Sequence, residues 1–171
     1  MNGYIQVYTG TGKGKTTAAL GLALRATGAG RKVFIAQFVK GRNYSEIEAI
    51  RKYLPDMEIK QYGLECFIVK TPTREDIDAA REGLSAVAEI LASGQYDVVI
   101  LDEATIAVHY NLFSVEELIG AIKGKKQETE VIITGRNAPA KLMEMADLVT
   151  EMKEVKHYYT RGVKARKGIE Y

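Results

Sequence analysis

The sequence is poor in the residues that build disulfide frameworks and metal clusters. Its 171 residues include one cysteine (Cys66), two histidines (His109 and His157) and no tryptophan. A single cysteine excludes an internal disulfide, and neither histidine has a cysteine or carboxylate partner at the spacing typical of metal ligands. We therefore expect both histidines to have structural or hydrogen-bonding roles.

Long apolar runs and a strong excess of one charge are missing as well. The apolar stretches are far shorter than a membrane span, and a strand-like run begins at Tyr4, which leaves no room for a signal peptide. The net charge of +2 is too small to indicate nucleic-acid binding by itself. Since the length suits one domain, we expect residues 1–171 to form a single cytoplasmic domain that binds neither a membrane nor a nucleic acid.

A glycine-rich segment near the start has the composition of a phosphate-binding loop. Residues 9–17 read T-G-T-G-K-G-K-T-T, between a strand-like run and a helix-like run. Glycines let the backbone turn tightly and direct successive N–H groups at phosphate oxygens, and the following helix adds the positive end of its dipole. The segment predicts a nucleoside triphosphate site built from Thr9, Gly10, Thr11, Gly12, Lys13, Gly14, Lys15, Thr16 and Thr17.

Two side chains of this loop have distinct expected roles. Lys15 is placed to reach the outer phosphates, and the Thr16 hydroxyl to ligate Mg²⁺. The usual pattern G-x-x-x-x-G-K-[ST] has a glycine where this chain has Thr9, so Gly10 and Gly12 supply flexibility in a shifted register. A glycine-rich turn that merely contains a lysine is the alternative, and the flanking strand and helix argue against it.

Strand-like and helix-like segments alternate along the chain. We expect strands at 4–8, 32–38, 58–62, 96–101, 130–134 and 148–152, and helices at 16–27, 45–54, 73–94, 114–124 and 139–146. Capping boxes, Ser45-x-x-Glu48 and Ser114-x-x-Glu117, are predicted to begin two of the helices. Strands that are apolar on both faces predict a mostly parallel sheet with helices on both sides, an α/β phosphate-loop (RecA-like) fold. Its ligands should bind beyond the carboxyl ends of the strands.

The apolar strand D-V-V-I-L-D-E at 97–103 ends in two acids. A carboxylate at this position faces the phosphate loop and can hold Mg²⁺ directly or through water. Asp102 is expected to act through water, and Glu103 either ligates the metal or activates water. Arg136 follows a later strand and could reach the phosphates, with a solvated surface arginine as the alternative. The predicted metal ligands are thus Thr16, Asp102 and Glu103, and the predicted catalytic residues are Lys15, Thr16 and Glu103.

Several stretches together resemble the ATP:corrinoid adenosyltransferases of the bacterial cobalamin pathway. They are V-Y-T-G-T-G-K-G-K-T-T-A-A-L-G (7–21), Q-F-V-K-G (37–41), D-V-V-I-L-D-E (97–103), V-I-I-T-G-R-N-A-P (131–139), A-D-L-V-T-E-M (146–152) and V-K-H-Y-Y-T-R-G-V-K-A-R-K-G-I-E-Y (155–171). The resemblance covers essentially the whole chain. Its specific parts are the phosphate loop that begins with threonine and the ending G-V-K-A-R-K-G-I-E-Y.

The resemblance implies transfer of the 5′-deoxyadenosyl group of ATP to the cobalt of a reduced corrinoid, with release of triphosphate. Co(I) is itself the nucleophile and C5′ of the ribose is the electrophile, so no general base is needed. The protein then has to align the reactants and stabilise a highly charged leaving group. Lys13, Lys15, Arg136, the loop amides and a bound Mg²⁺ (or Mn²⁺) would do the latter. Because C5′ must face the corrinoid, we expect an unusual presentation of the nucleotide.

For the corrinoid, the resemblance implies aromatic groups that displace the lower axial ligand. The candidates are Phe38 and Phe67, with Tyr62 behind them, and Lys40 and Gly41 as further contacts unless they form a solvated loop. The chain has no tryptophan where relatives carry one, and it begins at its first strand where some relatives carry a helix, which leaves the closure of the site open. A flavoprotein or other reductase that supplies Co(I), and a homodimer, are also implied.

Two other functions fit the residues without the resemblance. A phosphate-loop kinase for a small molecule would need a site for an acceptor hydroxyl and would yield ADP. An ATP-dependent nucleic-acid-binding switch would use the tail 156–171, in which basic residues alternate with tyrosines. We expect this tail instead to fold back over the active site or to form ordinary surface.

Overall fold

The computed structural model describes residues 2–64 and 71–171. Six strands form one sheet in the order β3-β2-β4-β5-β1-β6, and every neighbouring pair is parallel. The predicted α/β class with a parallel sheet is confirmed. The strands are β1 (Ile5–Thr9), β2 (Val33–Phe38), β3 (Met57–Tyr62), β4 (Val98–Asp102), β5 (Glu130–Thr134) and β6 (Leu148–Glu151).

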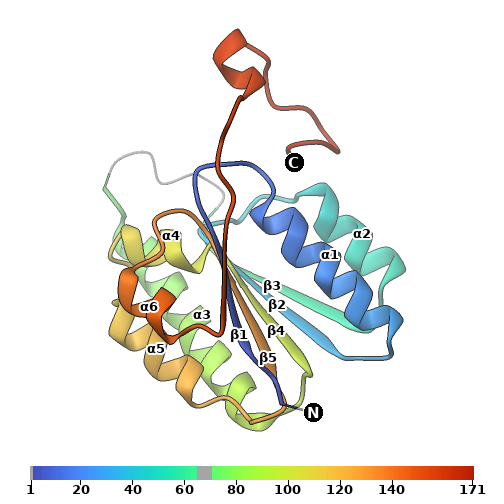
Figure 1. The fold of residues 1–171 in the computed structure, drawn as a ribbon, viewed down its shortest axis with the longest axis vertical. Helices are drawn as coiled ribbons and strands as arrows, with labels where there is room; N and C mark the ends of the chain where they lie inside the picture. Colours follow the sequence, from blue (N-terminus) through green and yellow to red (C-terminus); the bar gives the residue numbers. More distant parts are fainter. Residues whose placement is uncertain (1, 65–70) are drawn as a thin grey trace.

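Helices cover both faces of the sheet, as parallel strands joined by crossovers require. Figure 1 shows α1 and α2 on one face and α3, α4, α5 and α6 on the other. Among the described residues, no helix combines the length and apolarity needed to cross a lipid bilayer. The helices are α1 (Lys15–Gly28), α2 (Ser45–Tyr53), α3 (Arg74–Ser93), α4 (Ala104–His109), α5 (Val115–Lys123) and α6 (Ala140–Met145), with a short 3₁₀ helix, η1 (Tyr158–Arg161).

The alternation of side chains within the strands explains how two apolar cores form. In β2, Val33 and Ile35 pack with the α1 and α2 face, whereas Phe34, Ala36 and Phe38 pack with the opposite face. All six residues of β2 are buried, because helices lie on both sides. Strand β6 departs from the expected double burial: its four residues are exposed, since it lies at the edge of the sheet.

One of the two predicted capping boxes is wrong. The box at Ser114 is present, with its reciprocal side-chain contacts, but the box at Ser45 is not. Tyr44 is the N-cap of α2, and Ser45 is already its first helical residue. The Ser45 hydroxyl donates instead to the carbonyl of Tyr171 at 3.0 Å, and Glu48 accepts from the side chain of Asn43. A contact with the distant end of the chain thus replaces the local one.

Some helix boundaries also differ from expectation. Helix α4 begins directly after Glu103, in a segment expected to be loop, and η1 was not predicted. Pro139 is the N-cap of α6 and not part of its first turn. Gly28 is still helical at the end of α1, and Ala29 is the C-cap, so that Gly30, with φ 76°, takes the left-handed turn.

After β6, a segment that we call the C-terminal strap (residues 152–171) leaves the sheet. Figure 1 shows it rising beyond the carboxyl ends of the strands and then turning back toward the start of α1 and α2. Its first residue still pairs with the phosphate loop: the Met152 N–H donates to the Thr9 carbonyl at 2.8 Å, and the Gly12 N–H donates to the Met152 carbonyl at 2.6 Å.

Candidate functional site

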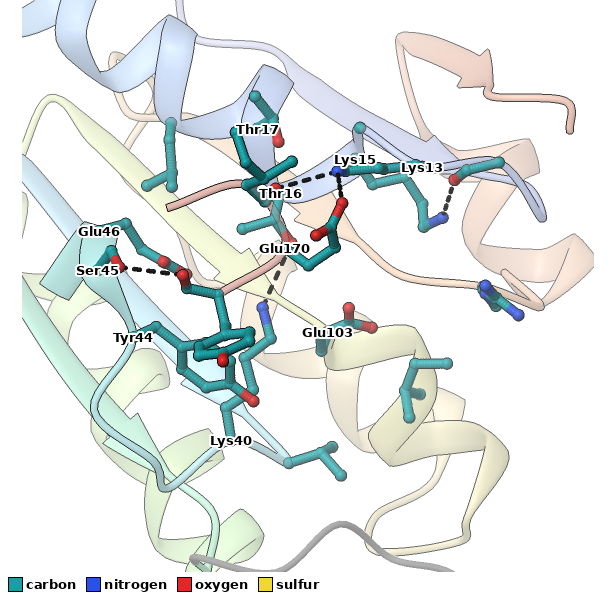
Figure 2. A pocket seen from close by; sticks show the side chains of 18 of the residues that line it. Lys13, Lys15, Thr16, Thr17, Lys40, Tyr44, Ser45, Glu46, Glu103 and Glu170 are labelled. Atoms are coloured by element: carbon teal, nitrogen blue, oxygen red, sulfur yellow. Dashed lines mark hydrogen bonds and ion pairs between the residues drawn. The ribbon is translucent and has the colours of Figure 1, made fainter. Parts of the chain in front are cut away.

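The carboxyl edge of the sheet contains a pocket of about 830 Å³. Segments that follow four different strands line it: the phosphate loop after β1, Val39 and Lys40 after β2, Glu103 after β4 and Arg136 after β5. The start of α2 and the end of the strap complete the wall (Figure 2). A pocket of this size, at this edge of a parallel sheet, is where such folds bind ligands.

The shape of the phosphate loop depends on glycines that lie against the strap. A Cβ atom on Gly10 would lie 2.5 Å from the Met152 carbonyl oxygen, and one on Gly12 would lie 2.7 Å from it. Gly10 and Gly14 also have positive φ angles, 100° and 119°. A larger residue at any of these positions would therefore force the loop away from Met152 or strain its backbone.

The position where the usual pattern has a glycine belongs to the strand in this protein. Thr9 is the last residue of β1, and its hydroxyl accepts a hydrogen bond from the Ala138 N–H at 3.3 Å. Gly10 then makes the turn, which explains the shifted register. Of the predicted nucleotide-binding residues, Gly12 to Thr17 line the pocket, whereas Thr9, Gly10 and Thr11 are not among the described residues that do.

Lys15 is buried and folds back over its own loop. Its ammonium group donates to the carbonyls of Gly10 at 2.8 Å and Gly12 at 2.7 Å, and only 7% of the residue is exposed. Burial lowers the pKa of Lys15, while the charges of Glu103 and Asp102 oppose this effect. Among the residues that the structure describes, the hydrogen-bond acceptors of this ammonium group are carbonyls, which an anion entering the pocket could replace.

The Asp102 carboxylate is the centre of a buried hydrogen-bond network. Its Oδ1 accepts from the hydroxyls of Thr16 at 2.8 Å and Thr134 at 2.7 Å. Its Oδ2 accepts from the ammonium group of Lys40 at 2.8 Å and the amide of Gln37 at 3.2 Å. The residue is 1% exposed, so these four donors replace water around its charge. The network joins the phosphate loop to β4, although β5 lies between β1 and β4 in the sheet.

Glu103, the second acid, has a strained backbone and lines the pocket. Its φ of 59° lies in the left-handed region, which is uncommon for residues other than glycine, and its N–H donates to the Thr134 hydroxyl at 3.0 Å. Burial and the neighbouring charge of Asp102 raise the pKa of Glu103, and the cations of Lys40, Lys15 and Arg136 counteract this. Backbone strain of this kind persists only where the surrounding structure holds the residue in place, and it is found most often at active sites and ligand-binding sites.

Lys40, predicted as a corrinoid contact, lies inside the Asp102 network. Besides its ion pair with Asp102, its ammonium group is 3.4 Å from the Thr16 hydroxyl, and 14% of its side chain is exposed. Burial disfavours the charged form, but the charges of Asp102 and Glu103 and the hydrogen bond to Asp102 outweigh this effect and raise the pKa of Lys40. Lys40 is therefore a cation beside two of the three predicted metal ligands, Thr16 and Asp102.

The oxygen ligands at this point suit a hard cation. Thr16 offers a hydroxyl, and Asp102 and Glu103 offer carboxylates. In the part of the chain that the structure describes, no three His, Cys, Asp or Glu side chains are grouped as metal ligands. A metal ion here would need phosphate oxygens and water to complete its shell, which is how Mg²⁺ is usually bound beside nucleotides. The residues thus fit the predicted Mg²⁺.

The other predicted site residues do not all line the pocket. Arg136 is exposed but lines the pocket, and its carbonyl accepts from the Thr105 hydroxyl at 2.7 Å. Phe38 is fully buried and packs on Phe113 and Tyr62, with ring centroids 5.4 Å and 6.0 Å away, so its side chain belongs to the core. A Cβ atom on Gly41 would lie 2.4 Å from the backbone of the loop after β3, which gives this glycine a packing role. Phe67 lies outside the described residues.

The C-terminal strap closes the pocket on the side of the phosphate loop. The Lys13 ammonium group lies 2.8 Å from the Glu170 carboxylate, and it donates to the Tyr158 hydroxyl and the Ile169 carbonyl, both at 3.0 Å. Gly168 to Tyr171 and His157 line the pocket. The tail therefore folds back over the site. Figure 2 shows Lys13 and Glu170 beside each other at the loop.

Some residues of the site were missed from sequence. Gln37 and Thr134 hold Asp102 in place, and both are buried polar residues at or near the carboxyl ends of apolar strands. A single polar residue at that place in a buried strand is the signal that would have identified them, because such a side chain needs a partner.

Comparisons with known proteins cover the whole chain. The family model described as ATP:corrinoid adenosyltransferase BtuR/CobO/CobP matches residues 1–171. The corrinoid adenosyltransferase of Escherichia coli is 40% identical over 171 residues, which cover 99% of this chain and 86% of the relative. The corrinoid adenosyltransferase CobA of Salmonella typhimurium is 39% identical with the same coverage. The Pseudomonas aeruginosa corrinoid adenosyltransferase is 36% identical, covering 99% and 84%. With a phosphate loop and an acid-ended strand meeting in one pocket, the chain belongs to the ATP:corrinoid adenosyltransferase family.

Proposed function

We propose that this protein transfers the 5′-deoxyadenosyl group of ATP to the Co(I) centre of a reduced corrinoid. The cobalt electron pair forms the new bond to C5′, the bond from C5′ to the triphosphate oxygen breaks, and triphosphate leaves with that electron pair. The observation that carries the proposal is the contact of the buried Asp102 with Thr16, which lines the pocket of about 830 Å³, in a chain that matches the family over its full length.

The reaction requires alignment of cobalt with C5′ and stabilisation of the charge on the leaving triphosphate. The pocket contains groups that can stabilise this charge. We assign ATP binding to residues 9–17 and Arg136, and catalysis to Lys15, Thr16 and Glu103. Lys15 would exchange the Gly10 and Gly12 carbonyls for phosphate oxygens of the leaving group. A fixed donor of this kind stabilises developing charge by about 2–4 kcal/mol.

We assign Mg²⁺, or Mn²⁺, to Thr16, Asp102 and Glu103. When bound, the ion would neutralise part of the charge on the triphosphate. Thr134 and Gln37 would keep the Asp102 carboxylate oriented, because each donates to one of its oxygens. No general base is required, since no proton leaves during the transfer.

Several expectations for the whole protein also stand as proposals. Residues 1–171 would act as one domain, in the cytoplasm, as a homodimer, with a flavoprotein or other reductase supplying Co(I). Corrinoid contacts are proposed for Lys40, Gly41, Tyr62 and Phe67. A contact by Phe38 would require this side chain to leave the core in which it is fully buried.

Anaerobic incubation with ATP, Mg²⁺ and a chemically reduced corrinoid tests the proposed reaction. We expect a light-sensitive cobalt–carbon bond and an equal amount of triphosphate. Formation of ADP in place of triphosphate would contradict the proposal and favour a kinase. Binding of polynucleotides that weakens with salt, together with slow hydrolysis to ADP and phosphate, would favour a nucleic-acid-binding switch.

A further inference from the structure

Lys40 holds a positive charge at the position where the proposed metal would bind. Its ammonium group lies 2.8 Å from Asp102 Oδ2 and 3.4 Å from Thr16 Oγ1, atoms of two of the three residues to which Mg²⁺ is assigned. Only 14% of the Lys40 side chain and 2% of the Asp102 side chain are exposed. A carboxylate buried to this degree needs a cation or strong donors, and Lys40 is the cation that the chain itself provides.

We propose that Lys40 is the internal counter-ion of Asp102, and that metal binding displaces it, so that the two cations compete for one carboxylate. This inference rests on the metal site of the proposed function. Binding of the metal would thereby release the ammonium group into the pocket, where it adds to the positive charge available to a polyphosphate. Metal binding and polyphosphate binding would then favour each other.

The arrangement of donors indicates which contact must change. Both oxygens of Asp102 already accept two hydrogen bonds each, so a metal ion, or its water, cannot approach without replacing a donor. Thr16 is itself a proposed ligand. Thr134 and Gln37 are fully buried at the ends of β5 and β2. Lys40 is the donor with a long side chain in a loop, and it would also be repelled by a divalent ion beside it.

The surroundings of Lys40 allow such a movement. The preceding residue, Val39, has φ 59°, a conformation that is strained for a β-branched side chain. The ammonium group already lies 5.6 Å from the centroid of the Tyr44 ring, which lines the same pocket. A rotation of the side chain away from Asp102 can therefore keep it near an aromatic face and inside the pocket (Figure 2).

The test measures Mn²⁺ binding by the full chain without nucleotide or corrinoid, using the electron paramagnetic resonance signal of free Mn²⁺. Lys40→Met removes the competing cation, and we expect it to bind Mn²⁺ at least about ten times more tightly than the unmodified protein. Lys52→Met is the matched control, because it removes the same charge from an exposed position near the end of α2 that does not line the pocket. The control should change Mn²⁺ affinity by less than about threefold.

Equal or weaker Mn²⁺ binding by Lys40→Met, or no Mn²⁺ binding by either protein, would overturn the inference. A second measurement serves if Lys40→Met does not fold. In unmodified protein with ¹⁵N-labelled lysine, Mg²⁺ alone should shift the Lys40 ammonium resonance and leave that of Lys13 in place. An unshifted Lys40 resonance at saturating Mg²⁺ would equally reject the displacement. Since neither experiment contains ATP or corrinoid, their results do not depend on whether adenosyl transfer is found.

Discussion

At the scale of single residues, Lys15 has the clearest assignment. It is a buried cation whose present partners are two main-chain carbonyls of its own loop. A carbonyl is a weaker partner for an ammonium group than a phosphate oxygen, because the phosphate oxygen carries a negative charge and the carbonyl oxygen does not. An anionic ligand that enters the pocket can therefore replace these carbonyls as the hydrogen-bond partner of Lys15.

Lys15→Ala tests this assignment. The substitution removes one charge from the leaving-group site, and we expect the rate of adenosyl transfer to fall by a factor of about 10²–10³. The rate is followed by the absorbance change on formation of the cobalt–carbon bond. Circular dichroism of the variant controls for folding. A variant that is folded and nearly as fast as the original would remove Lys15 from the mechanism.

Tyr96 offers a test that is independent of the reaction. Its hydroxyl donates to the Glu58 carboxylate, and burial together with this contact raises its pKa to about 12 from the ordinary value of 10.0. Between these two values the unfolded chain loses a proton that the folded chain keeps. The free energy of unfolding should therefore fall as pH rises above 10.

Urea unfolding of the original protein and of Tyr96→Phe, at pH 9 and at the highest pH at which both stay folded, measures this contribution. The original protein should lose more stability than the variant over this interval. Nine other tyrosines are common to both proteins, since the chain contains ten, so the difference isolates Tyr96. Equal losses would mean that Tyr96 ionises normally in the folded state.

At the scale of elements, the phosphate loop and the C-terminal strap form one unit. The main chain of Met152 bonds with Thr9 and Gly12, and the side chain of Glu170 bonds with Lys13. The pKa of Glu170 is lowered by its hydrogen bonds to Arg166, Lys13 and Tyr158. Because its pKa is lowered, the Glu170 carboxylate stabilises the docked strap fully at pH values above 4.5, the ordinary pKa of the group. This stabilisation is lost as the pH falls through the lowered pKa.

Glu170→Gln should release the strap from Lys13. Arg161, Lys164 and Lys167 are exposed in the strap, so trypsin can report on its docking. We expect the variant to be cleaved several-fold faster than the original protein at neutral pH. Glu154→Gln is the control, because it removes a carboxylate of the same strap that forms no ion pair with Lys13 among the described residues. If both variants are cleaved at the original rate, the ion pair does not hold the strap.

The elements themselves were largely predictable, because hydrophobic periodicity and the phosphate loop are local patterns. The six strands and five of the helices were identified from sequence, and the residues of the phosphate loop and β4 were placed at one end of the sheet. The capping box at Ser45 failed because its hydroxyl bonds with Tyr171, a partner 126 residues away that no local pattern contains.

The partners of Asp102 were less predictable for the same reason. Gln37, Lys40 and Thr134 reach Asp102 only because β2 and β5 are the two neighbours of β4 in the sheet. Strand order is a property of the whole fold, and the alternation of strands and helices does not determine it. The interior position of Phe38 likewise depends on the packing of Phe113 and Tyr62 around it.

At the scale of the whole molecule, the pocket is assembled from both ends of the chain. The strap contributes one wall, but among its described residues none is buried, and no strand of the sheet belongs to it. Its contribution to the hydrophobic cores is correspondingly small. Removal of the strap should therefore weaken ATP binding but have little effect on the stability of the fold.

A chain that ends after Lys156 tests this separation. We expect its thermal unfolding temperature to stay close to that of the original protein, while its affinity for ATP falls about tenfold, equivalent to roughly 1.4 kcal/mol. Differential scanning calorimetry and isothermal titration calorimetry measure the two quantities. A large loss of stability with unchanged ATP affinity would mean that the strap supports the fold and not the pocket.

The contact between Lys13 and Glu170 joins residues separated by 157 positions. During synthesis on the ribosome, the phosphate loop emerges well before the strap residues that complete its pocket. All six strands precede the strap, so the sheet can form before translation ends. Until the strap has emerged, the newly made chain would have its phosphate-binding backbone but an open pocket, so it would bind nucleotide less tightly than the chain with its strap in place.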